Sequence, residues 1–91
     1  MLIALIAKDK PDVSQIRADN RPAHLEYLKA NAETVFQAGP LLDADGGMIG
    51  SLIILDVTDM AAAQDWAAND PYAKAGLFAS VELIQWNKVI G

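Results

Sequence analysis

Apolar residues gather in four short runs along this chain, separated by glycines, prolines and charged residues. The first run is apolar for seven residues before Lys8, and it predicts a strand over residues 1–8, bounded by the turn-like Asp9–Asp12. Three further strands are expected, with a loop at Asp43–Gly47 between the second and third strands. They cover Thr34–Ala38 (ending at Gly39-Pro40), Gly50–Val57, and roughly Ala79–Lys88.

The first helical region separates the first two strands. It is expected from about Ser14, as its N-cap, to Asn31. Pro22 lies within this region. We expect it to interrupt the helix or to start a second segment, because proline has no N–H for the helix ladder.

The second helical region follows the third strand. Thr58 or Asp59 caps a helix that runs to about Asn69. Pro71 then starts a short helical turn, and Gly76 stops it. The order βαββαβ predicts an α+β, ferredoxin-like sandwich, with four antiparallel strands and two helices on one face of the sheet.

The strands themselves are apolar on both sides. A sheet covered on one face only should alternate apolar and polar residues, yet every position of residues 1–7 is apolar and Leu52–Leu55 repeats the pattern. The two helices can cover one face. Leaving the other face in water would cost about 25 cal/mol per Å². We therefore expect a homodimer whose sheets pack face to face, related by two-fold symmetry.

Length and charge narrow the class of protein. The 91 residues make one domain, 1–91, and they include no cysteine and one histidine, which excludes thiolate and multi-histidine metal sites. A net charge of −5 argues against nucleic-acid binding. No apolar run is long enough to span a bilayer, and the first residues lack the pattern of a secretory signal. We expect a cytoplasmic protein with no cofactor and no metal.

The basic residues are concentrated near the single histidine. Lys8, Lys10, Arg17 and Arg21 are four of the seven Lys and Arg residues. On a continuous helix, Arg17, Arg21 and His24 lie along one stripe. Two guanidiniums can bind a carboxylate or a phosphate, and an imidazole transfers protons near neutral pH. This stripe is therefore a candidate acid–base site for a small anionic ligand.

A structural explanation of the same residues stays open. In it, a backbone carbonyl satisfies a partly buried His24, and the arginines pair with Asp19 or Glu26. Asp70 likewise has two interpretations. As the residue before Pro71 it is a typical helix N-cap; as a partner of His24, its carboxylate would orient the ring and favour the charged imidazolium.

These residues also carry a resemblance to the YciI-like (YCII-related) proteins over nearly the whole chain. The matching residues are Arg17 with Arg21-Pro22-Ala23-His24-Leu25, Gly39-Pro40, Gly50-Ser51, Ala67 before Asp70-Pro71-Tyr72, Ala75-Gly76, and Lys88-Val89. The chain departs from the family in a shorter loop, Leu41–Ile49, and in the tail Ile84-Gln85-Trp86-Asn87-Lys88. Both departures affect the inference of substrate identity more than the inference of which residues form the site.

The resemblance implies a dimeric ferredoxin-like α+β barrel with an active site centred on a histidine and an aspartate. Those roles fall on His24 and Asp70, while Arg17 and Arg21 match the family's arginine positions. Apart from the resemblance, the place of Tyr72 next to Asp70-Pro71 makes it a candidate residue of the pocket lining. One relative is a dehydrochlorinase of chlorinated aromatics. The leading hypothesis is a cofactor-free lyase or isomerase acting on a small anionic or enolic substrate. The alternatives are a non-catalytic dimeric module that binds a small ligand and, by analogy of fold alone, a cofactor-free monooxygenase.

Overall fold

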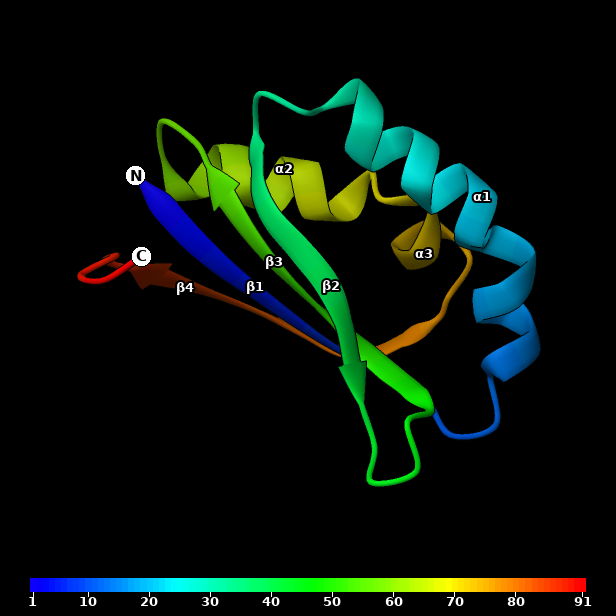
Figure 1. Cartoon of the computed structure of the whole chain (residues 1–91). Coiled ribbons are helices and arrows are strands. Elements are labelled where there is room, and N and C mark those ends of the chain that lie inside the picture. Colours follow the sequence, from blue (N-terminus) through cyan, green and yellow to red (C-terminus); the bar gives the residue numbers. More distant parts are fainter.

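The computed structural model describes all 91 residues and contains one four-stranded antiparallel sheet. The strands are ordered β2-β3-β1-β4, and the helices lie on one face of the sheet (Figure 1). This is the predicted ferredoxin-like βαββαβ arrangement, with a third, short helix. The elements are β1 (Leu2–Asp9), α1 (Ser14–Ala30), β2 (Val35–Leu42), β3 (Met48–Asp56), α2 (Met60–Ala68), α3 (Pro71–Lys74) and β4 (Phe78–Trp86).

The core lies between the helices and the inner face of the two central strands. Alternate residues of β1 are buried, with Ile3 and Leu5 paired across the ladder to Leu55 and Ile53 of β3. Trp66 of α2 packs against this cluster. The pattern of period two predicts such a buried face, because successive side chains on a strand point to opposite sides of the sheet.

The outer face of the sheet is also apolar. Leu52 of β3 and Ile84 and Trp86 of β4 lie on it, with exposed fractions of 39%, 50% and 38%. The expected two-sided character of the strands is therefore present in the structure. Figure 1 shows no helix on this side of the sheet.

The first helix differs from its prediction. α1 continues through Pro22 without interruption. Pro22 and Ala18, whose carbonyl loses its helical partner, are both exposed, so water can satisfy that carbonyl. The helix begins at Ser14 after Val13, so the expected N-cap at Ser14 was wrong by one position, and Val13 provides no side-chain cap.

The second strand also differs from its prediction. It was expected to end at Gly39-Pro40, but β2 runs through both residues to Leu42. β2 is an edge strand, and a proline without an N–H is tolerated there because one side of the strand carries no ladder bonds. The loop at Asp43–Gly47 is confirmed: the Asp43 carboxylate accepts the N–H groups of Asp45 and Gly47 at 2.9 and 2.8 Å.

The other boundaries agree within two residues. Asp59 is the N-cap of α2, where its carboxylate accepts the N–H of Ala62 at 2.8 Å. Gly76 follows α3 with φ of +75°, a conformation that favours glycine. No helix has the length and apolar character needed to cross a membrane.

Two strand glycines provide a test of the sheet. A Cβ at Gly50 would collide with the backbone carbonyl oxygen of Ala7 in β1, whereas a Cβ at Gly39 meets nothing within 4 Å. We expect Gly50→Ala to lower the free energy of unfolding by about 2 kcal/mol, because the collision pushes two central strands apart. Gly39→Ala is the matched control and should change it by less than about 1 kcal/mol. Denaturant unfolding followed by circular dichroism measures both, and equal effects would contradict the observed β1–β3 spacing.

Candidate active site

A buried hydrogen-bonded pair joins α1 to the start of α3. Nδ1 of His24 lies 2.8 Å from Oδ1 of Asp70, although 46 residues separate the two in sequence. The exposed fractions of His24 and Asp70 are 7% and 1%. The same Oδ1 accepts the N–H of Tyr72 at 2.9 Å, as expected of the N-cap of α3. The two interpretations of Asp70 therefore hold together, since one carboxylate oxygen both caps the helix and contacts the histidine.

The pair determines which ring nitrogen of His24 is available for chemistry. Because a carboxylate faces Nδ1, that nitrogen carries a hydrogen and donates a hydrogen bond to Oδ1 of Asp70. Nε2 has no hydrogen-bond partner within the protein, and His24 lines a cavity. Oδ2 of Asp70 is buried and accepts no hydrogen bond, so both hydrogen bonds to this carboxylate are made at Oδ1. In this tautomer a neutral ring presents its lone pair at Nε2.

Tyr72 fills the space between His24 and Arg17. Its ring stacks on the imidazole with centroids 3.9 Å apart and an interplanar angle of 15°. The guanidinium carbon of Arg17 lies 4.8 Å from the centroid of the same ring. His24 and Arg17 are seven residues apart on α1, a rise of about 10.5 Å, so a ring this close to both lies between them. The continuous helix thus produces the stripe predicted from the sequence.

Arg17 is held by two residues, Asp9 and Ser51, to which the sequence analysis gave no role in the site. Its Nε donates to Oδ2 of Asp9 at 2.8 Å, and its Nη2 donates to Oδ1 of Asp9 at 3.0 Å and to Oγ of Ser51 at 3.2 Å. Both side chains of the ion pair are 7% exposed. Burial opposes the charge of Arg17, but the hydrogen bonds and the charge of Asp9, together with Tyr72, outweigh it and raise the pKa of Arg17. The alternative in which Arg17 pairs with Asp19 or Glu26 is not what the structure shows.

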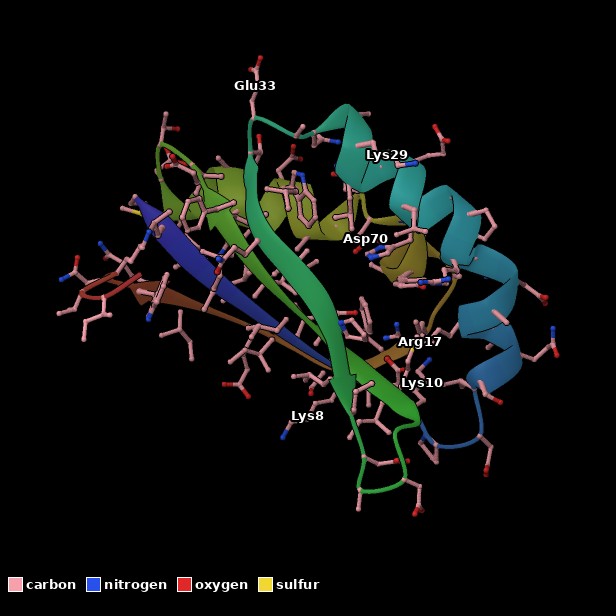
Figure 2. All side chains as sticks on the ribbon, viewed as in Figure 1. Lys8, Lys10, Arg17, Lys29, Glu33 and Asp70 are labelled. Carbon is pink, nitrogen blue, oxygen red and sulfur yellow. The ribbon has the colours of Figure 1, made fainter.

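A cavity of about 240 Å³ lies between α1 and the inner face of β2 and β3. Leu25, Leu28, Pro40 and Ile53 contribute to its apolar wall. Figure 2 shows Arg17 and Asp70 in the layer between α1 and the sheet, while Lys8 and Glu33 point outwards. The polar lining of the cavity consists of Arg17, Arg21, His24, Ser51 and Tyr72.

Arg21 differs from Arg17 in its surroundings. It is exposed, lines the cavity and forms no ion pair or side-chain hydrogen bond. Of the four clustered basic residues, Arg17 and Arg21 reach the cavity, whereas Lys8 and Lys10 do not line it. No group of three or more metal-ligating side chains occurs in the structure.

Comparison with known proteins identifies the family. The model of the YCII-related domain matches residues 1–87. The chain belongs to the YCII-related family. It is 35% identical to Protein YciI of Escherichia coli O6:H1 over 97 aligned positions, which cover 98% of this chain and 99% of the relative. An uncharacterized protein of Haemophilus influenzae is 36% identical over the same coverage.

Two solved structures extend the comparison. The chain is similar to the 5-chloro-2-hydroxyhydroquinone dehydrochlorinase TftG of Burkholderia phenoliruptrix, solved in complex with 2,5-dihydroxybenzoquinone, with a TM-score of 0.90 and 36% identity. The match covers 96% of this YCII-related chain and 94% of TftG. A protein of Mycobacterium tuberculosis matches all of the chain with a TM-score of 0.55 and 14% identity, which shows a shared fold.

Burial of the two tyrosines has a spectroscopic consequence. Burial raises the pKa of Tyr72 above its usual value of 10.0; Arg17 and Arg21 oppose this rise and Asp70 adds to it. Burial, Asp70 and Asp65 likewise raise the pKa of Tyr27. A phenol whose pKa is higher when folded stabilises the protein below pH of about 10, and this contribution is lost as the pH rises through the folded pKa.

We therefore expect phenolate absorbance to appear above pH 10 in the folded protein, and near pH 10 after unfolding in denaturant. Arg21→Gln should move the Tyr72 component still higher, because Arg21 lowers the pKa of Tyr72. Lys29→Gln, on the same helix, serves as the control. A folded-state midpoint at or below 10 would contradict the described burial of the phenols.

Proposed function

We propose that this protein is a small cofactor-free enzyme of the lyase or isomerase kind, in which His24 is the general acid and base. The single observation that carries the proposal is the 2.8 Å contact between His24 Nδ1 and Asp70, which leaves Nε2 free on a cavity. The similarity to the dehydrochlorinase TftG supports a reaction of this class on a small substrate.

In the proposed reaction, Nε2 removes a proton from a C–H or O–H group of the substrate. The electron pair of the broken bond moves into an adjacent carbonyl or expels a leaving group as its anion, as chloride departs in a dehydrochlorination. The imidazolium then returns the proton to another substrate atom or to solvent. Asp70 stabilises the imidazolium, and Arg21 holds an anionic or enolic oxygen of the substrate.

The role of Asp70 can be tested with one matched pair of substitutions. Asp70→Asn removes the charge beside His24, and Asp59→Asn makes the same change at the N-cap of α2, which does not contact the histidine. Asparagine caps helices well, so both variants should fold. Because the carboxylate stabilises the imidazolium that forms in the proposed reaction, we expect the turnover rate to fall in Asp70→Asn alone. An equal response of the two variants would refute an electrostatic pair.

Turnover separates catalysis from binding. We expect His24→Ala to lose 10²–10⁴-fold in rate on any substrate that the wild type converts, which is typical of general acid–base catalysis. Chloride release from 5-chloro-2-hydroxyhydroquinone, the substrate named for TftG, is the first assay. An unchanged rate in His24→Ala would overturn the catalytic role. Ligand binding without turnover in the wild type would favour a non-catalytic binding module, which needs the arginines but no proton-active histidine.

We also propose that two copies associate through the outer face of the sheet, where Leu52, Ile84 and Trp86 are exposed. Ile84→Lys should convert the dimer to a monomer, because it places a charge on an apolar interface. Val81→Lys is the control: Val81 is 42% exposed on the same strand but faces the helical side of the sheet. Sedimentation velocity distinguishes the two states, and a monomeric wild type would refute the dimer.

A further inference from the structure

We propose that the cavity selects a compact ligand with one negative charge and a neutral oxygen beside it, and that Asp9 is the residue that sets this selectivity. In this assignment Arg21 binds the charged group of the ligand, and Arg17 donates to its neutral hydroxyl or carbonyl oxygen. The inference rests on the proposed function only in taking the cavity as the ligand site.

The positive charge of Arg17 is already compensated within the protein. Two of its nitrogens contact both oxygens of Asp9 at 2.8 and 3.0 Å, and both side chains are 7% exposed. Asp9 itself does not line the cavity. A ligand in the cavity therefore meets the guanidinium of a neutral ion pair rather than a free cation.

Arg17 nevertheless retains hydrogen-bond donors. A guanidinium has five N–H groups. Three of them are engaged in Arg17: the N–H of Nε and one N–H of Nη2 donate to Asp9, and the other N–H of Nη2 donates to Ser51. The two N–H groups of Nη1 donate to no carboxylate, carbonyl or serine hydroxyl of the protein, although the Tyr72 hydroxyl interacts with the guanidinium, and Arg17 lines the cavity. A charge-compensated donor of this kind fits a neutral hydroxyl or carbonyl oxygen, which needs no net positive charge to be bound.

Arg21 supplies the uncompensated charge. It lies four residues after Arg17, one turn further along α1, and has no acidic partner. The remaining wall is apolar, with Leu25, Leu28 and Ile53, and a cavity of about 240 Å³ limits the ligand to a compact molecule. The ligand class that fits is an aromatic monoanion bearing a hydroxyl or oxo group.

The test compares small aromatic probes on the full chain at one pH, with binding followed by NMR. Benzoate carries one charge and phthalate carries two, and we expect the wild type to bind benzoate at least as tightly as phthalate. Asp9→Asn frees the charge of Arg17, which should shift the ratio of the two affinities towards phthalate by about tenfold. In addition, 3-hydroxybenzoate should bind the wild type several-fold more tightly than benzoate, and Arg17→Gln should abolish that difference.

The double variant Asp9→Asn/Arg17→Gln is the matched control. It removes one charge of each sign, so its preference between benzoate and phthalate should remain that of the wild type. It also covers the case in which Asp9→Asn does not fold because an unpaired guanidinium is left buried. Arg17→Gln alone then provides the opposite prediction: Asp9 is left uncompensated, and phthalate weakens about tenfold more than benzoate.

A clear wild-type preference for phthalate, or the same preference in every variant, would overturn the inference. So would failure of both probes to bind at about 10 mM, a concentration at which even weak ligands are largely bound. These outcomes are distinct from failure of the proposed function. The affinity ratio requires no turnover, whereas the catalytic role of His24 is decided by the turnover rates of His24→Ala and Asp70→Asn.

Discussion

The site depends on one buried carboxylate. Oδ1 of Asp70 accepts the first free N–H of α3 and contacts Nδ1 of His24, so helix capping and imidazole orientation are the same interaction. The cap fixes the position of Tyr72, two residues later, which stacks on the ring that the carboxylate orients. The same carboxylate therefore both begins the four-residue helix and holds this part of the site together.

The uninterrupted α1 provides the second constraint. Arg17, Arg21 and His24 share one face because the helical phase is preserved through Pro22. A break at Pro22 would rotate the first turns of the helix, and Arg17 would leave its position over Tyr72. The loss of one backbone hydrogen bond at Pro22, on the exposed side of the helix, is the cost of keeping this alignment.

Sequence reasoning predicted the order of the elements, the two-sided strands and the partners His24 and Asp70. Periodicity and capping are local signals, and the family motif linked the two residues across the chain. Sequence reasoning did not predict Asp9 as the partner of Arg17. Asp9 looked like part of a turn, since its role depends on how residues 10–13 bring the chain back, including Asp12 at φ of 59°. Ser51 was likewise missed, because its contact with Arg17 is made 34 residues away.

The strand β2 has a consequence for the motion of the molecule. Ala38, Gly39 and Pro40 line the cavity, and they belong to a strand that is bonded to the sheet along one side only. His24 and Tyr72, across the cavity, are instead held by the interactions of a buried carboxylate. Edge strands in general open locally at a lower free-energy cost than central strands. The wall of the cavity that is bonded on one side only is thus separate from the wall that holds His24 and Asp70, so a shift of β2 leaves the contact between these two side chains unchanged.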